Sequence, residues 1–213
     1  MIYELRTYTL KAGTQPEYLR LNKEVGREVR GDRFGTLVGG WTTEMGGLNQ
    51  YVHLWSYPSP DERDRLRAAL AKDSRWTTEY VPKIRPMMVA QENMLLTLDG
   101  DVGVRPVEGT GHVYEMRTYR AFPGQLVTWA KAMKGALPAR EQYSKIVGLW
   151  NVEVGPLNTA MHIWVYDDLK QRAEARAAAL QDPAWKAFVP VGSACLAEMK
   201  STILIPTEVS PLR

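Results

Sequence analysis

The side chains best suited to chemistry occur in two matching sets, one in each half of the chain. Each set combines a carboxylate, a guanidinium, an imidazole and aromatic rings. The sets are Glu4, Arg6, Tyr8, His53, Trp55 and Tyr57, and then Glu115, Arg117, Tyr119, His162, Trp164 and Tyr166. Carboxylate, guanidinium and imidazole groups that lie together can transfer protons or bind an anion. The pattern therefore predicts a proton-transfer or anion-binding site.

A catalytic interpretation gives each group a role. His53 and His162 are the candidates for moving a proton, and Glu4 and Glu115 are the candidates for orienting them. The arginines would hold an anionic or carbonyl group, and the rings would bound an apolar chamber. These candidate lining residues are Arg6, Arg117, Tyr8, Tyr119, Trp55, Trp164, Tyr57 and Tyr166.

A structural interpretation accounts for the same residues without a ligand. Buried charges are normally paired, so Glu4 and Arg6 would form an internal brace. A histidine among aromatic rings is often a hydrogen-bonded core residue. A duplication copies structural residues as faithfully as functional ones, so repetition favours neither interpretation, and both remain open.

The two sets belong to a tandem duplication with about a hundred residues per copy, far longer than a solenoid repeat. Residues 3–8 recur almost unchanged as residues 114–119. Further matches in register are Trp41 with Trp150, Asn49 with Asn158, Arg63 with Arg172, Arg67 with Arg176, Asp73 with Asp182 and Trp76 with Trp185. The Gly-containing stretch 99–111 indicates an exposed linker. The expected domains are therefore residues 1–98 and 112–213, joined by the linker 99–111.

Each copy predicts the same order of elements. Residues 2–10 alternate like a strand, a capping box at 14–17 begins a helix that runs to about residue 30, and strands follow near 36–45 and 49–57. A second helix begins with the cap at 59–62, and a final strand lies near 93–98, with its twin at 201–206. This βαββαβ order is ferredoxin-like, an α+β unit with helices on one face of an antiparallel sheet.

Alternation along the third strand predicts which side chains share a face. Val52 and Leu54 lie on one side, and His53, Trp55 and Tyr57 on the other. We expect the aliphatic side to pack on the helices. The aromatic side would then meet the other repeat, with the two sheets packed face to face as an intrachain α+β barrel. Two further carboxylates, Glu44 and Glu153, are expected to join from the rim.

Composition excludes several other classes of protein. The 213 residues have a formal net charge of +3 and no apolar run long enough to span a bilayer, so we expect no membrane insertion. The arginines around residues 63–75 alternate with acids, which is typical of a solvated helix surface and not of nucleic-acid binding. Three scattered histidines predict no metal site. The pairs Gly39-Gly40 and Gly46-Gly47 indicate hairpin turns and not phosphate loops.

The single cysteine, Cys195, has small or apolar neighbours, so we expect a buried thiol and not a nucleophile. It cannot form an intrachain disulfide, which fits a reducing compartment. The N-terminal residues enter a strand pattern at once, without a signal or transit peptide. The expected location is the cytoplasm.

The repeated hexapeptide, together with residues 40–44 and 48–57, resembles the NIPSNAP family. Glu62-Arg63 and residues 67–70 are similar as well, and the resemblance covers both copies. It is closer in the first copy, because Asn151-Val152 and Thr159-Ala160 depart from the pattern in the second. Membership implies the dimeric α+β-barrel superfamily, here as a tandem two-copy member. Its relatives include cofactor-independent monooxygenases and haem-handling proteins, a fold-level analogy.

Two functions follow as hypotheses. In the first, the protein binds a small apolar or anionic molecule in or beside the barrel, with no cofactor, either as a binding protein or as a cofactor-independent enzyme. In the second, it is a non-enzymatic structural or interaction protein with a solid barrel core. Self-association as a homo-oligomer is compatible with both.

Overall fold

The computed structural model describes residues 1–100, 102–105 and 107–213; Asp101 and Pro106 of the predicted linker lie outside the described residues. The chain divides into two compact units. Unit 1 consists of Met1–Leu95 and Ile205–Arg213, and unit 2 consists of Leu96–Leu204. Each unit contains one of the two sets of candidate site residues.

The first repeat contains four strands and a series of helical segments. In chain order they are β1 (Ile2–Leu10), α1 (Gln15–Leu21), the π-helical turn η1 (Asn22–Gly26), α2 (Arg27–Arg30), β2 (Thr36–Met45), β3 (Gln50–Tyr57), α3 (Pro60–Leu70), the π-helical turn η2 (Trp76–Tyr80), α4 (Val81–Ile84), the 3₁₀ turn η3 (Arg85–Met87) and β4 (Met88–Leu98). The second repeat follows the same plan with longer helices. Its elements are β5 (Val113–Ala121), α5 (Leu126–Arg140), β6 (Lys145–Val154), β7 (Thr159–Tyr166), α6 (Leu169–Ala179), α7 (Pro183–Ala194) and β8 (Leu196–Pro206).

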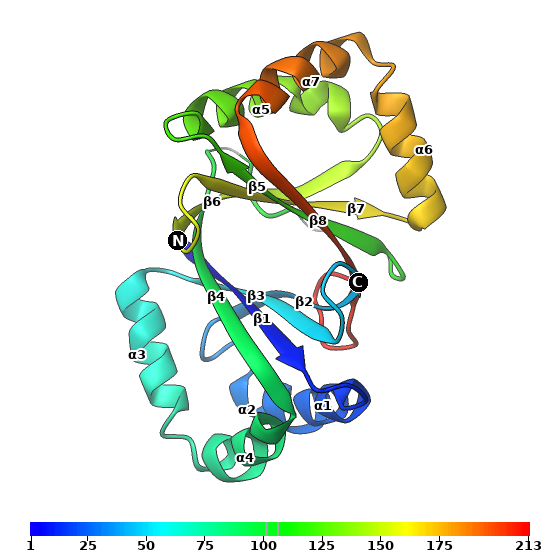
Figure 1. The fold of residues 1–213 in the computed structure, drawn as a ribbon. Helices are drawn as coiled ribbons and strands as arrows, with labels where there is room; N and C mark the ends of the chain where they lie inside the picture. Colours follow the sequence, from blue (N-terminus) through cyan, green and yellow to red (C-terminus); the bar gives the residue numbers. More distant parts are fainter. Residues whose placement is uncertain (101, 106) are drawn as a thin grey trace. The chain divides into compact units, whose positions relative to one another are not determined.

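The strand order confirms the predicted fold class. The strands are hydrogen-bonded in the order β1-β3-β2-β8-β5-β7-β6-β4, a closed barrel. Within each repeat the first strand pairs antiparallel with the third, and the third pairs antiparallel with the second. This is the ferredoxin-like arrangement, so the fold is α+β with two tandem ferredoxin-like repeats. In each unit the helices cover one face of the sheet (Figure 1).

The helix caps agree with the sequence at the second helix of each repeat and differ at the first. Ser59 accepts a hydrogen bond from the Glu62 amide (3.1 Å), and Asp168 accepts one from the Gln171 amide (2.7 Å). These bonds satisfy amides that the first helical turn leaves without an intrahelical partner. The predicted capping box at Thr14 does not form, because its hydroxyl donates to the Lys11 carbonyl (2.8 Å).

A helix that the sequence analysis did not predict precedes the last strand of each repeat. In the second repeat it is α7, which begins where Asp182 accepts hydrogen bonds from the amides of Ala184 and Trp185 (2.9 and 3.1 Å). In the first repeat Asp73 accepts one from the Trp76 amide (3.0 Å). The repeated Asp-x-x-Trp spacing was the available signal for this helix.

The predicted orientation of the strand faces is wrong. His53 and Trp55 line a cavity together with Tyr18 of α1, Arg30 of α2 and Arg67 of α3. The polar and aromatic face therefore meets the helices of its own repeat, as it also does in the second repeat. Long arginine side chains from the helices provide the charges that a polar sheet face requires, since their apolar stems pack while the guanidinium groups make hydrogen bonds.

The Gly39-Gly40 pair lies inside β2 and not in a hairpin turn, which corrects the prediction. A Cβ atom at Gly39 would collide with the ring of Trp41, which is fully buried. The glycine is therefore required by close packing of the indole ring. Along the described part of the chain, no helix is both long and apolar enough to cross a membrane.

Candidate functional site

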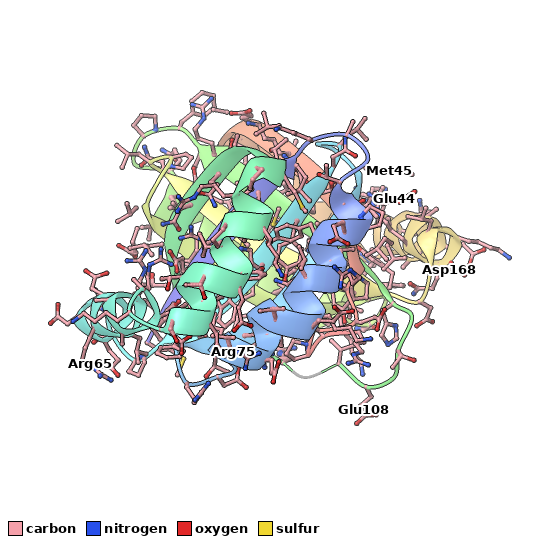
Figure 2. The ribbon with its side chains drawn as sticks, turned by 90° about the horizontal axis from the view of Figure 1, so that it is seen from below. Glu44, Met45, Arg65, Arg75, Glu108 and Asp168 are labelled. Carbon is pink, nitrogen blue, oxygen red and sulfur yellow. The ribbon has the colours of Figure 1, made fainter. Side chains whose placement is uncertain are left out.

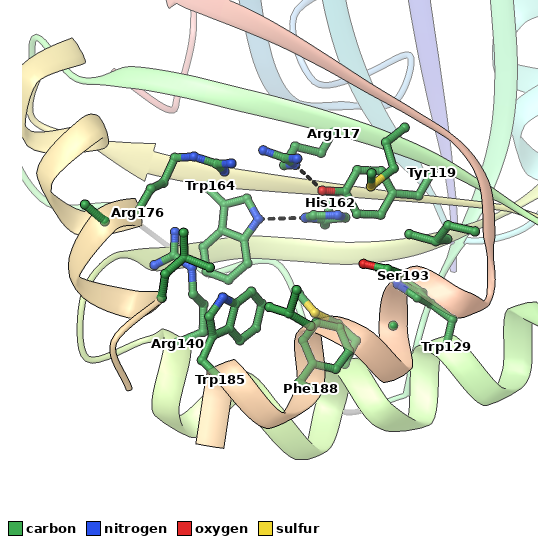
Figure 3. Close-up of a pocket in the computed structure, with 17 residues that line it drawn as sticks. Arg117, Tyr119, Trp129, Arg140, His162, Trp164, Arg176, Trp185, Phe188 and Ser193 are labelled. Atoms are coloured by element: carbon green, nitrogen blue, oxygen red, sulfur yellow. Dashed lines mark hydrogen bonds between the residues drawn. The ribbon is translucent and has the colours of Figure 1, made fainter. Parts of the chain in front are cut away.

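The second repeat contains a cavity of about 450 Å³ between its sheet and its helices (Figure 3). Strands β5 and β7 contribute the polar end, and the three helices contribute most of the apolar wall. The lining residues include Arg117, Tyr119, His162 and Trp164 from the strands, and Trp129, Arg140, Arg176, Trp185 and Phe188 from the helices. Ser193 and Met199 also line the cavity and are exposed, so they mark its opening to solvent.

His162 lies at the polar end of the cavity in a fixed chemical form. The Trp164 indole nitrogen donates to His162 Nδ1 (2.6 Å; Figure 3), so the network assigns the proton of the neutral imidazole to Nε2. That Nε2 is buried and has no hydrogen-bond partner among the described residues. Burial, together with the charge of Arg117, lowers the pKa of His162 to about 3. At neutral pH the ring is therefore a hydrogen-bond donor and not a proton acceptor.

Glu115 lies behind the cavity wall as the anchor of an arginine cluster. Its fully buried carboxylate accepts hydrogen bonds from Arg117 Nη1 (2.7 Å), from Arg172 Nε and Nη2 (3.0 and 2.8 Å) and from Ser201 Oγ (2.6 Å). Burial raises the pKa of Glu115, but the Arg172 hydrogen bond, the charge of Arg117 and the Ser201 hydrogen bond outweigh it and lower the pKa to about 2. The carboxylate is therefore permanently ionised at neutral pH.

Arg140 contributes a buried guanidinium to the helix side of the cavity. It donates to Ser144 Oγ (2.6 Å) and to the Tyr166 hydroxyl (3.2 Å), and it lies 4.6 Å from the ring centre of Trp164. Tyr166 in turn donates to Glu115 (3.4 Å). Arg140 is therefore held by neutral groups and by a cation–π contact.

The first repeat has the same polar cluster. Glu4 is fully buried and accepts hydrogen bonds from Arg6 (2.9 Å) and Arg63 (2.5 Å), and the Trp55 indole donates to His53 Nδ1 (2.6 Å). Burial lowers the pKa of His53 well below its usual value. The sheet side of the two sites is thus nearly identical.

The cavities differ in size, because tyrosine side chains fill the first one. It has a volume of about 170 Å³, against about 450 Å³ in the second repeat. Tyr51 and Tyr80 line the first cavity, and the duplication places Ala160 and Val189 at the corresponding positions of the second. Two rings are therefore replaced by small side chains, and the space that they leave is open in the second repeat.

The structure groups most of the predicted residues. The residues of the predicted set that line a cavity are Arg6, Tyr8, His53 and Trp55 in the first repeat and Arg117, Tyr119, His162 and Trp164 in the second. The glutamates and the tyrosines Tyr57 and Tyr166 belong to the supporting cluster. Glu44 and Glu153 are exposed and line neither cavity, which corrects the rim prediction. Figure 2 shows Glu44 at the surface.

Within the stretch 63–75, Arg63 is not a solvated surface charge, which corrects the prediction for this residue. Arg63 is only 15% exposed and pairs with Glu4, and Arg172 does the same with Glu115. Arg65, by contrast, points outward and pairs with Glu62 (Figure 2). The signal available in the sequence was that Arg63 and Arg67 recur in register at Arg172 and Arg176, whereas Arg65 does not recur.

The part of the chain that the structure describes holds no group of three or more His, Cys, Asp or Glu residues suited to a metal ion. Cys195 is buried, as predicted, and its thiol donates to the Val191 carbonyl (3.4 Å).

The buried histidines predict a loss of stability in mild acid. Both pKa values are lowered in the folded state, so between the folded value and about 6.5 the unfolded chain takes up protons that the folded protein does not. Stability is therefore full above pH 6.5 and falls as the pH drops, and His162 alone accounts for a loss of about 2 kcal/mol between pH 7.5 and pH 5. Urea unfolding across this range measures the slope.

A double variant, His53→Gln with His162→Gln, is the matched control for this slope. It is expected to flatten the pH dependence between pH 7.5 and pH 5, whatever its effect on stability at pH 7.5. A wild-type unfolding midpoint that stays constant over the range would mean that the imidazoles are not held neutral.

The comparisons with known proteins agree in assigning one family. A family model described as NIPSNAP matches residues 3–100 and 114–211. NipSnap homolog 3A of Homo sapiens is 33% identical over 218 residues, which cover 100% of this chain and 86% of that protein. The NipSnap homolog of Dictyostelium discoideum is 30% identical over 212 residues, which cover 98% of this chain and 88% of that protein.

The solved structures show the fold. An anthrone oxidase-like protein aligns with a TM-score of 0.67 at 12% identity, covering 99% of this chain and 93% of that chain. Identity at this level carries the fold and not the activity. Since the family model matches both repeats and curated relatives align over the whole length, the chain belongs to the NIPSNAP family.

Proposed function

We propose that the second repeat binds one small molecule that is mostly apolar and has an anionic or carbonyl end. The observation that supports this most is the difference between the two cavities. The polar cluster is duplicated, but only the second copy leaves about 450 Å³ of lined space, a volume typical of small-molecule pockets. A cluster needed only as a brace would not require that space.

The polar end of the cavity suits an oxygen atom of the ligand. Arg117 and the Nε2–H of His162 are both donors, and the second has no partner among the described residues. A buried donor without a partner costs free energy that a ligand oxygen would recover. If the ligand has a carbonyl group, two donors at its oxygen would stabilise negative charge that develops on that oxygen. Such stabilisation would support a reaction at the carbonyl carbon without a cofactor.

The role of His162 in this proposal differs from the proton transfer expected from sequence. Nδ1 is occupied by the Trp164 indole, and the low pKa of His162 leaves the ring a poor base. His162 would therefore orient and polarise the ligand rather than remove its proton.

We assign the first repeat the alternative, structural role. Its cavity is about 170 Å³, and the tyrosines Tyr18, Tyr51 and Tyr80 line it. The rings of Tyr18 and Tyr51 lie 5.3 Å apart, centre to centre, and Asn22 donates to the Tyr80 hydroxyl (3.0 Å). These contacts make the first site a packed core with a buried ion pair.

Filling the second cavity is the direct test. Val189→Tyr introduces the side chain that the first repeat carries at this position, on a helix residue that is only half-buried. The ring would occupy the cavity, so binding of the fluorescent probe 1-anilinonaphthalene-8-sulfonate should weaken by about tenfold or more. Fluorescence titration of folded wild type and variant measures the change.

The reciprocal variant in the first repeat is the matched control. Tyr80→Val removes the ring that packs over Gly26, so it should open the first cavity and add a second binding event. If wild type binds no probe, or Val189→Tyr binds it as tightly as wild type, the cavity is not the binding site and the proposal fails.

A further inference from the structure

The charged residues that line the second cavity all have the same sign. They are Arg117, Arg140 and Arg176, and no carboxylate is among the described residues that line it. A cavity with cationic walls and a low-dielectric apolar body concentrates anions. The lining therefore favours an anion over a neutral molecule.

The single negative charge of Glu115 is shared among Arg117, Arg172 and Arg176 and does not balance them. Its two oxygens already accept hydrogen bonds from Arg117, Arg172, Ser201 and Tyr166, and a carboxylate has about four lone-pair sites. Arg176 Nη1 lies 3.6 Å from Glu115 Oε2, beyond hydrogen-bond distance. The hydrogen bonds from the other partners therefore use the acceptor capacity of Glu115, and none is left for Arg176.

Arg176 differs from the other two lining arginines because it makes no hydrogen bond to the described residues. Its side chain is 40% exposed, and Figure 3 shows it at the same end of the cavity as Arg117. Arg140 is bonded to hydroxyl groups, and Arg117 is bonded to Glu115 and Tyr119. An incoming carboxylate could take hydrogen bonds from Arg176 without breaking an existing hydrogen bond, because Arg176 holds Glu115 only by an ion pair at 3.6 Å.

The first repeat balances the same charges better. There Arg63 forms a second ion pair, with Asp64 (2.6 Å), in addition to the one with Glu4. The duplication places Ala173 at the position of Asp64 in the second repeat. The second repeat, which has the larger cavity, therefore has one carboxylate fewer beside its arginine cluster than the first repeat has.

Three aromatic rings from the helices contribute to the apolar wall, together with aliphatic and methionine side chains. Trp129, Trp185 and Phe188 line it, and the rings of Trp185 and Phe188 lie 4.8 Å apart, centre to centre, at 42°. Aromatic rings pack against a flat ring in offset or edge-to-face geometry and gain more than from area alone. The wall therefore favours a planar aromatic body over a flexible alkyl chain, which would also lose more rotational freedom on binding.

We propose that the ligand of the second repeat is an aromatic monocarboxylate, with its carboxylate on Arg176 and His162 and its ring against Trp185 and Phe188. This inference rests on the proposed function and deepens it by naming the ligand class. The carboxylate would supply the negative charge that the site lacks.

Three probes of related size separate the parts of this proposal in isothermal titration calorimetry. They are 2-naphthoate, its neutral amide 2-naphthamide, and the aliphatic carboxylate decanoate. The expected result is that 2-naphthoate binds one site and binds about 10- to 100-fold more tightly than 2-naphthamide, since the amide lacks a charge-assisted hydrogen bond. Decanoate should also bind more weakly than 2-naphthoate.

Arg176→Met tests whether Arg176 binds the carboxylate of the ligand, and Arg67→Met in the first repeat is its matched control. Arg176→Met should weaken 2-naphthoate by about tenfold or more and leave 2-naphthamide unchanged, and Arg176→Lys should restore part of the loss. Arg67→Met should change the affinity for neither probe, because tyrosine side chains leave only about 170 Å³ in the first cavity.

The outcomes separate the two proposals. Equal affinity for 2-naphthoate and 2-naphthamide would overturn the anionic ligand, and equal or tighter binding of decanoate would overturn the aromatic one. In either case binding that Val189→Tyr weakens would still support the proposed cavity. Absence of binding by all three probes, in a protein that does bind the anilinonaphthalene probe in this cavity, would overturn the ligand class alone.

Discussion

Glu115→Gln is expected to lower the free energy of unfolding by about 3–5 kcal/mol at pH 7. The amide keeps the shape of the side chain but removes the negative charge that, among the described residues, pairs with both Arg117 and Arg172. It also replaces one acceptor oxygen with a donor that faces other donors, which leaves buried polar groups unsatisfied. Urea unfolding followed by circular dichroism measures the loss.

Two further variants serve as comparisons for Glu115→Gln. Glu4→Gln removes the equivalent charge in the first repeat and should cost a similar amount, since Glu4 is also fully buried. Glu153→Gln changes an exposed carboxylate that accepts a hydrogen bond from Thr97 (2.7 Å), and should cost less than about 0.5 kcal/mol. A loss below about 1 kcal/mol for Glu115→Gln would show that the cluster does not need its charge.

Acid should erase the difference between Glu115→Gln and wild type. The pKa of Glu115 in the folded protein is about 2, below the ordinary value of 4.5. The contribution of a carboxylate with a lowered pKa is full above the unfolded value and is lost as the pH falls through the folded value. The stability gap should therefore narrow between about pH 4.5 and pH 2, and the effect of the histidines cancels because both proteins carry them.

The sequence was sufficient for the fold because the chain repeats itself. The register of the duplication located strands, turns and the second helix in both copies, and each copy checked the other. The predicted ferredoxin-like order and the barrel follow from that order of elements, since βαββαβ leaves few ways to bury both faces of a sheet. The candidate residues that line the two cavities were selected because they recur in both copies.

The orientation of the site could not be predicted in the same way. Alternation shows that His162 and Trp164 share a face, but every residue of β7 is buried, so neither face has the polar pattern of a surface. Only the helix residues that contact the sheet could show which face of β7 meets the helices. Arg172 on α6 pairs with the buried Glu115. In the sequence Arg172 resembles a solvated surface residue, so its pairing with a buried carboxylate could not be predicted.

The cavity itself depends on differences between the copies, which similarity conceals. Trp185 and the preceding Asp182 are repeated, but Val189 stands where the first repeat has Tyr80. Helix α7 was not predicted, so Val189 had no assigned position next to the site. The second cavity exists because a tyrosine ring is absent, and this can be recognised only when the positions of the surrounding helices are known.

Gly148→Ala is expected to destabilise the protein by about 1–3 kcal/mol, although it adds one methyl group. A Cβ at this position in β6 would lie 2.5 Å from the ring of Trp150, which is fully buried and cannot move aside without displacing its own neighbours. The backbone of Gly148 is not in the left-handed region, so the cost is steric. The urea midpoint of the variant measures it.

Gly135→Ala makes the same chemical change with the opposite expected sign. Gly135 lies inside α5, is exposed, and has no atom within 4 Å of an added Cβ. Alanine there should stabilise the protein by about 0.5–1 kcal/mol, because glycine loses more backbone entropy in a helix. If the two variants shift the midpoint in the same direction, close packing of Trp150 on Gly148 is not what selects glycine in β6. Opposite shifts would extend the same argument to Gly39 beneath Trp41, where the first repeat makes the same contact.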